Sequence, residues 1–229
     1  MHRQPDPPRL RNWKCRQVYH VYQRGSQRQN TFHQPAHLLR YLDRLDVFAR
    51  RYKVRIHAFC LMSNHVHFLF EPLRRGAISR LMQHLQSDHA RYMNGLKGTE
   101  GHLWRNHFHA KHIATPAQYQ KTVLYIEQNP TAAGIAKQAH LYAYSSAAAH
   151  VANDPVFVLA HKGKKVQVKL YLERWRREFA VDADTNWGAW LRSPREADYL
   201  QAVARWMGKP PQPAIALPAS AIAVSARGS

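Results

Sequence analysis

The chain has 229 residues, 45% of them hydrophobic, which suits one ordinary domain with extensions or two small domains. Its 34 Lys and Arg residues against 14 Asp and Glu residues give a formal net charge of +20, which favours a polyanionic partner, most commonly nucleic acid. The two cysteines stand outside any C-x-x-C pair, which argues against a zinc ribbon or a disulfide framework. A basic surface without a partner, or one that faces a membrane, is the alternative that charge alone leaves open.

The first half of the chain alternates predicted strands and helices. Residues 1–15 are rich in Pro and Arg and are expected to form a flexible basic N-terminus. The stretch RQVYHVYQRG, residues 16–25, alternates in the manner of a strand and stops at Gly25, before the polar turn GSQRQN. Residues 35–52 carry apolar side chains at helical spacing, with a proline at the start, and predict a helix.

Two strands, a helix, an irregular strand and a further helix are predicted next. VRIHAFCLMS and NHVHFLFEP are strands separated by a short break at Ser63 and Asn64. Residues 76–96 then read as a helix, and GHLWRNHFHAKHI, residues 101–113, as a fourth strand of irregular shape. The last helix is expected to open at Pro116 and to end at Pro130.

This order predicts an α+β fold of the ferredoxin-like type, a mostly antiparallel sheet with helices packed on it, over residues 16–150. Residues 151–209 are predicted to be a mainly helical basic C-terminal region, with amphipathic helices over 166–181 and 193–209. Residues 210–229 are rich in Pro and Ala and are expected to be disordered. No apolar run is long enough for a signal peptide or a spanning helix, so we expect a cytoplasmic protein.

The stretch SNHVHFLFEP places His65 and His67 one residue apart on a predicted strand. Residues two apart on a strand point to the same face, so the two imidazoles project together while Val66, Phe68 and Phe70 face a buried side. Two neutral imidazoles on a rigid strand form half of a divalent-metal site. The alternative is a pair of surface histidines on the open face of a sheet, and H-x-H alone does not decide between them.

The helix that contains YIEQNP offers a nucleophile and a third ligand. Tyr125 and Asn129 are four residues apart and therefore share one helical face. A tyrosine hydroxyl beside a metal can attack a phosphodiester, and an Asn carbonyl oxygen can coordinate the metal. Taken without context, however, the pattern favours a core tyrosine followed by a residue that ends the helix.

Three segments in order, HAFCLMSNHVHFLF, GHLWRNHFHAKHI and YIEQNPTAAGI, resemble the HUH single-tyrosine transposases, specifically the REP-associated tyrosine transposases. The opening YHVYQRGSQRQNTF resembles the first strand and turn of that family, and the resemblance covers roughly residues 16–150. It implies a ferredoxin-like fold and cleavage of single-stranded DNA through a covalent 5′-phosphotyrosine. The matching positions imply Tyr125 as the nucleophile, and His65, His67 and Asn129 as ligands of Mg²⁺ or Mn²⁺.

The resemblance also implies a substrate, a hairpin-forming palindromic repeat with a single-stranded flank. It implies no protein partner and favours a monomer over a dimer. Two positions depart from the family. Ser63 stands where Pro is usual, and Ala132 stands where an Arg often follows the Asn-Pro turn, which puts one DNA contact in doubt.

Candidate DNA contacts fall into three groups. Arg and Gln side chains of the first turn suit base edges, Arg to guanine and Gln to adenine. A basic run near residue 53 suits phosphate contacts, with a solvated face as an equal alternative. The stretch around residue 104 suits stacking on unpaired bases, although its tryptophan fits a core equally well. The residues are Arg24, Gln27 and Arg28; Arg50, Arg51, Lys53 and Arg55; and Trp104 and Arg105.

Three other functions stay open on the sequence. One is a catalytically inactive nucleic-acid-binding protein that uses the same basic surface. Another is a metal-dependent nuclease that uses water instead of tyrosine. The third is RNA binding, since charge alone does not distinguish RNA from DNA.

Overall fold

The structure, a computed structural model, describes residues 13–178. In chain order the elements are β1 (Val18–Arg24), α1 (Pro35–Tyr52), β2 (Val54–Leu61), β3 (His65–Pro72), α2 (Ala77–Lys97), β4 (His109–Ile113), α3 (Pro116–Ala132), α4 (Ala147–Val151), β5 (Val156–His161), β6 (Lys164–Lys169) and α5 (Leu172–Glu178). No helix in this part of the chain is long and apolar enough to cross a membrane.

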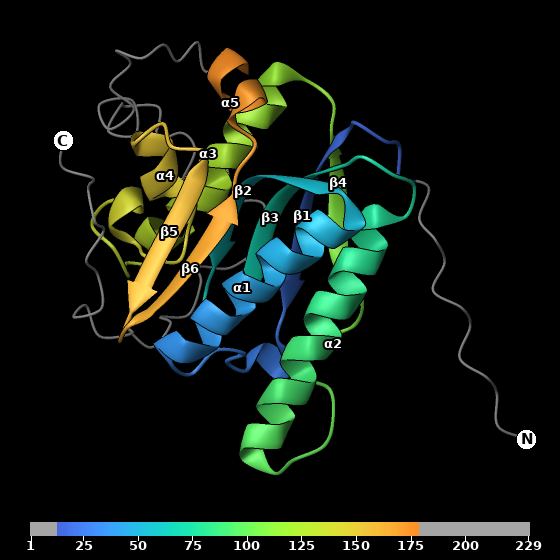
Figure 1. Ribbon diagram of the computed structural model, residues 1–229, viewed down its shortest axis with the longest axis vertical. Coiled ribbons are helices and arrows are strands. Elements are labelled where there is room, and N and C mark those ends of the chain that lie inside the picture. The colour runs from blue at the N-terminus through green and yellow to red at the C-terminus, as the bar shows by residue number, and fades with distance from the viewer. Residues whose placement is uncertain (1–12, 179–229) are drawn as a thin grey trace, which may run out of the picture.

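Four strands form one antiparallel sheet in the order β2-β3-β1-β4. Helices α1 and α2 lie side by side on one face of this sheet, and α3 lies on the other face (Figure 1). This is the predicted ferredoxin-like α+β arrangement, and the predicted fold class is confirmed.

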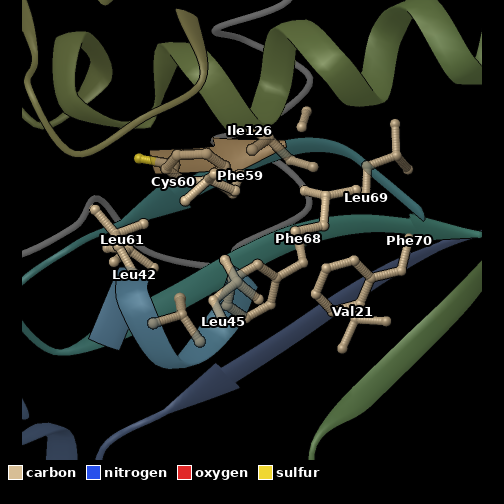
Figure 2. Packing of buried hydrophobic residues seen from close by; sticks show 14 of the residues in the cluster. Val21, Leu42, Leu45, Phe59, Cys60, Leu61, Phe68, Leu69, Phe70 and Ile126 are labelled. Atoms are coloured by element: carbon tan, nitrogen blue, oxygen red, sulfur yellow. The ribbon is translucent and has the colours of Figure 1, made fainter. Parts of the chain in front are cut away.

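The core follows from the strict alternation of side chains along β3. Phe68 and Phe70 point toward α1, where Leu42 and Leu45 meet them, whereas Leu69 points toward α3 and lies near Ile126 (Figure 2). All six side chains are fully buried. A strand buried on both faces explains why the H-x-H stretch is so apolar, and it fixes β3 rigidly between two helical layers.

The fourth strand is shorter than the sequence predicts. It begins only at His109, because Asn106 adopts a left-handed backbone conformation (φ 51°) that breaks the extended run. Before that break, Trp104 forms a single bridge with Gly25. The N-terminal prediction also needs correction at its end, since Trp13 is buried and its indole N–H donates to Ser79 Oγ at 2.8 Å. Residues 1–12 lie outside the described residues.

Helix α3 does not end at Pro130, as the sequence suggested, but continues to Ala132. Proline lacks only the N–H that would bond to the carbonyl of residue 126, and Pro130 lies in the last turn, where one missing bond costs least. Thr115 caps the other end, accepting a hydrogen bond from the Gln118 N–H. Tyr125 and Asn129 therefore stand on continuous helix.

The prediction of a helix over residues 166–181 is wrong in its first half. Residues 164–169 form β6, which pairs with β5 across a tight turn at Lys162 and Gly163, both with positive φ. Val166 and Val168 alternate strictly with exposed Lys165 and Gln167, a strand period. Of the described residues in this range, only those of α5 are helical, and the hairpin packs along α1. The helix expected at 193–209 and the tail at 210–229 lie outside the described residues.

Two buried polar clusters fasten α3 to the rest of the fold. Near its N-terminal end, Tyr119 lies 2.9 Å from His57 Nδ1, and His57 Nε2 lies 3.1 Å from Glu71. Near its C-terminal end, Glu127 Oε1 accepts hydrogen bonds of 2.5 Å from Ser146 Oγ and His150 Nδ1. His150 in turn stacks on the fully buried Trp175 of α5, with ring centroids 4.7 Å apart.

Removal of the Glu127 carboxylate should destabilise the protein strongly. Glu127→Ala leaves the buried His150 Nδ1 without its acceptor and removes the shorter of two hydrogen bonds from the Ser146 hydroxyl, and an unsatisfied buried donor typically costs about 1–3 kcal/mol of unfolding free energy. Glu127→Gln keeps an acceptor oxygen and should lose less. Chemical denaturation measures both, with the exposed Glu100→Ala as control. Equal stability of Glu127→Ala and the wild type would show that the cluster does not hold α3 in place.

Candidate active site

The pairing of β1 with β3 gathers the polar side chains of the site on the face that α3 covers. In this antiparallel register Tyr22 lies opposite His67, and Arg24 lies opposite His65. His20, two residues before Tyr22, shares the same face and places Nε2 3.0 Å from Nδ1 of His67. The two predicted histidines therefore do project together, as H-x-H on a strand requires.

Tyr125 of α3 stands over these imidazoles. Its ring meets that of His67 edge-on with centroids 5.2 Å apart, and that of His20 in the same manner at 5.5 Å. The tyrosine is 8% exposed, so only a small part of it reaches solvent. The predicted nucleophile and the predicted histidine pair thus come together from elements far apart in the sequence.

Asn129 follows one turn further along α3. Its Nδ2 donates to the Tyr125 carbonyl at 2.7 Å, and its side chain lies close enough to the His65 ring and the Tyr125 hydroxyl to influence the pKa of both. His65 Nε2 is buried and forms no well-shaped hydrogen bond within residues 13–178. An unpartnered imidazole nitrogen next to an amide fits the corner of a cation site.

The donor set contains no carboxylate. No group of three or more His, Cys, Asp or Glu side chains in the described part of the chain is arranged to hold a metal ion. A cation here would rely on His65, His67 and the amide oxygen of Asn129, all of them neutral. Two imidazole nitrogens and one amide oxygen suit a transition-metal ion better than Mg²⁺, because Mg²⁺ prefers oxygen ligands.

Burial sets the ionisation of the site. It lowers the pKa of His65 to about 4, helped by the nearby Arg24 charge and opposed by Asn129, and it lowers that of His67 well below the usual value. Both imidazoles are therefore neutral near pH 7, the form that binds metals. Burial raises the pKa of Tyr125 to about 12, while Asn129 and Arg24 act in the opposite direction. The hydroxyl consequently carries its proton at neutral pH.

The turn after β1 is held against the start of β3. The Gly25 N–H donates to the Asn64 carbonyl at 2.7 Å, and a side chain at Gly25 would meet the Gln29 carbonyl oxygen at 2.3 Å. Asn64 Nδ2 also reaches the Arg28 carbonyl at 3.3 Å. Arg24, Gln27 and Arg28 therefore flank the histidine pair, with the last two exposed. Only glycine fits at the tight point of this turn.

The segment around residue 104 divides into a core residue and a surface residue. Trp104 is 8% exposed, donates to the Gln86 carbonyl at 3.2 Å and packs near Phe32 and His89, which favours the core alternative over base stacking. Arg105 is exposed, and its N–H donates to the Arg24 carbonyl at 2.8 Å. Arg105 thus lies beside the site.

The basic run at residues 50–55 lies elsewhere. Arg55 pairs with Glu71 near the end of β3, opposite to the end that carries His65, about 20 Å away along the strand. Arg55 forms an ion pair with Glu71 at 3.1 Å, and Arg50 forms one with Asp46 at 2.8 Å. Arg51 and Lys53 are exposed. The structure does not bring this group together with the catalytic candidates.

Sequence reasoning missed two neighbours of the histidine pair. The sequence places His20 on a predicted strand but gives no role for its side chain, because the register that brings it to His67 is a long-range property. Asn64 was noted only as part of the break before β3, yet its Oδ1 lies 2.6 Å from His65 Nδ1. The signal for Asn64 was its position next to His65, whereas nothing local in the sequence identified His20.

A known protein family matches the part of the chain that carries the candidate site. The model of the family described as "Transposase IS200 like" matches residues 14–129, about half of the chain. That range includes β1, β3 and α3 up to Asn129. No curated protein matches the chain.

Several solved structures share parts of the fold. A REP-associated tyrosine transposase bound to a REP hairpin is 18% identical, with 64% of this chain and 82% of that one covered and a TM-score of 0.49. A transposase from Deinococcus radiodurans R1, known only by similarity, is 18% identical, with 52% and 92% covered and a TM-score of 0.36. A bacterial tRNA(His) guanylyltransferase-like protein in complex with GTP is 9% identical, with 74% and 90% covered and a TM-score of 0.39. Similarity at this level does not transfer an activity.

Acidification should destabilise the folded protein before its carboxylates are protonated. Burial lowers the pKa of His20, His65 and His89 from 6.5 to about 4, so between these values the unfolded chain binds protons that the folded chain excludes. The stability contributed by each neutral imidazole is complete above about pH 6.5 and is lost as the pH falls toward 4, on the order of 1–3 kcal/mol per group.

Urea denaturation at a series of pH values between 7 and 5 measures this loss. His89→Gln keeps a donor for the Thr31 carbonyl, which His89 Nε2 contacts at 2.8 Å, and should flatten the curve. An unfolding free energy that stays constant over this range in the wild type would contradict the prediction.

Proposed function

Because the chain belongs to the family of IS200-like transposases, we propose that it cuts and rejoins single-stranded DNA by transesterification through Tyr125. The family makes it a DNA transposition enzyme. The observation that supports the tyrosine mechanism is the meeting of Tyr125 with His67, with ring centroids 5.2 Å apart, and with the amide of Asn129 one turn away. A nucleophile beside neutral imidazoles and an amide suits phosphodiester chemistry.

In the proposed reaction the Tyr125 oxygen attacks the phosphorus of the scissile phosphate in line. The bond to the 3′ oxygen breaks as the bond to Tyr125 forms, and the tyrosine proton ends on the departing 3′ oxygen. The products are a 5′-phosphotyrosine and a 3′-hydroxyl end. No bond energy is lost, so a 3′-hydroxyl can reverse the step and rejoin the strand without ATP.

The buried tyrosine needs help to lose its proton, since its pKa is raised to about 12. Arg24 lies near enough to lower that pKa, and its positive charge also suits the developing negative charge on the phosphate oxygens. His65, His67 and Asn129 would hold Mg²⁺ or Mn²⁺. When bound, such a cation supplies further charge stabilisation at the phosphate.

The proposed substrate is a hairpin-forming palindromic repeat with a single-stranded flank, as the resemblance to REP-associated transposases implies. Arg24, Gln27, Arg28 and Arg105 lie beside the histidine pair and would contact the DNA next to the cut. Arg50, Arg51, Lys53 and Arg55 would contact phosphates further along the hairpin. We propose a monomer, as the resemblance to REP-associated transposases favours.

Tyr125→Phe should abolish cleavage while leaving DNA binding within about tenfold of the wild type, because one hydroxyl is worth about 1 kcal/mol. The test incubates protein with hairpin oligonucleotides from the repeats beside its own gene, with Mg²⁺ or Mn²⁺, and looks for a denaturation-resistant adduct. The wild type should form the adduct, and a chelator should prevent it. Tyr144→Phe is a control at a buried tyrosine on another segment. Full cleavage by Tyr125→Phe would instead indicate a nuclease that uses water.

The two basic groups should differ in what they recognise. Arg28→Ala should weaken hairpin binding by about 1–3 kcal/mol and relax the preference for the native sequence, because an exposed guanidinium in this turn can reach a base edge. Arg51→Ala should weaken binding to all sequences alike and lower the salt slope by about one.

Fluorescence anisotropy at several salt concentrations measures both effects. Arg91→Ala, which removes one exposed charge from α2, is the control and should leave binding unchanged. Equal losses of binding free energy for Arg28→Ala on the native hairpin and on a scrambled one would show that Arg28 does not recognise bases.

A further inference from the structure

The two histidines of the pair are each engaged through the same ring nitrogen. His65 Nδ1 lies 2.6 Å from Asn64 Oδ1, and His67 Nδ1 lies 3.0 Å from His20 Nε2. In both rings this leaves Nε2 as the nitrogen that is not used by the neighbour. A neutral imidazole has one N–H and one lone pair, so whatever holds Nδ1 decides which nitrogen is able to bind a cation.

The contact with Asn64 fixes the tautomer of His65. The Asn64 amide has its own orientation set by the Arg28 carbonyl, which can only accept and therefore takes the Nδ2 hydrogen at 3.3 Å. The remaining amide atom, Oδ1, can also only accept, so His65 must carry its proton on Nδ1. Its Nε2 is then a lone-pair nitrogen, and this atom is buried and forms no well-shaped hydrogen bond within residues 13–178.

The contact between His20 and His67 admits two arrangements. If His67 donates from Nδ1, its Nε2 keeps a lone pair; if His20 donates from Nε2, the Nε2 of His67 bears a hydrogen and cannot bind a cation. Only the first arrangement is compatible with the role of His67 in the proposed function. His20 is 5% exposed and its ring is stacked against that of His67, with centroids 5.2 Å apart, so this neighbour is held in place.

We propose that His20 and Asn64 are positioning residues that hold His67 and His65 in the Nδ1–H tautomer, so that both Nε2 lone pairs are offered to the same cation. This inference rests on the proposed function, because it assumes that the histidine pair binds a cation. Each positioning residue comes from outside the H-x-H motif, His20 from β1 and Asn64 from the turn before β3. Asn64 also joins His65 to the turn that carries Arg28, a candidate DNA contact.

The tautomers are directly measurable in the full-length protein without metal. Long-range ¹H–¹⁵N correlation spectra distinguish an imidazole protonated on Nδ1 from one protonated on Nε2, and His65→Gln and His67→Gln assign the signals. We expect the Nδ1–H form for both histidines in the wild type. His20→Phe keeps a ring but removes the acceptor, and should shift His67 toward the Nε2–H form.

Binding of Mn²⁺, followed by the electron paramagnetic resonance signal of the free ion, gives the second readout. Loss of a partner of this kind typically weakens metal binding about 10- to 100-fold, and we expect that loss for His20→Phe and for Asn64→Ala. His20→Gln and Asn64→Asp each keep an acceptor oxygen and should restore much of the affinity. His84→Phe removes an exposed histidine on α2 and should have no effect. Thermal denaturation of every variant identifies any that has simply lost its fold.

The outcomes separate this inference from the proposed function. Wild-type Mn²⁺ affinity in folded His20→Phe and Asn64→Ala, or an Nε2–H form of His67 in the wild type, would overturn the positioning roles and leave the tyrosine chemistry standing. A wild-type protein that forms the phosphotyrosine adduct but binds no Mn²⁺ would overturn the ligand assignment together with this inference. Absence of the adduct in the presence of normal tautomers and normal Mn²⁺ binding would count against the proposed function alone.

Discussion

The antiparallel register between β1 and β3 is the constraint on which the candidate site depends. It sets Tyr22 opposite His67 and Arg24 opposite His65, and it brings His20 within 3.0 Å of His67. A slip of β3 by one residue would turn His65 and His67 to the face of α1 and α2, away from the side chains of β1. That slip is prevented by the core, since Phe68 and Phe70 on the opposite face of β3 would then leave their buried positions. The apolar side chains thus fix the position of the polar ones.

The second requirement is that α3 hold Tyr125 at a constant height above the sheet. Val123 and Ile126 are fully buried and give the helix its apolar contact. The contact with His57 at one end and the buried Glu127 cluster at the other fix its direction along the sheet, because hydrogen bonds are directional whereas apolar contacts are not. Tyr125 stands between these two anchors. Trp175, which stacks on His150, extends the same support to the C-terminal region.

Much of this arrangement could be predicted from sequence, and the reasons for the failures are specific. Periodicity identified α1 and α2, and the H-x-H pattern identified the shared face of His65 and His67, because both are local properties of the backbone. The helix predicted from residue 166 is wrong in its first half because the apolar residues of KVQVKLYL fit both the helical period and the strand period. The turn at Lys162 and Gly163 decides for a hairpin. The sequence does not decide whether Trp104 is a core residue or a base-stacking residue, since its burial depends on the distant Phe32 and His89. The contact of His20 with His67 was not predicted for the same reason, because a contact between residues 47 positions apart has no local signature.

The absence of a carboxylate from the proposed ligand set connects the site to the charge of the whole protein. His65, His67 and Asn129 are neutral, and the nearest charged group that affects them is Arg24, which repels a cation. In the proposed function, a divalent ion held by such ligands would keep its full charge, and the scissile phosphate would supply the anion that the ligand set lacks. By linkage, DNA would then strengthen cation binding, and the cation would strengthen DNA binding by the same factor. A formal net charge of +20 favours an order in which DNA binds before the metal ion, because this charge attracts nucleic acid, and not a cation, to the protein surface.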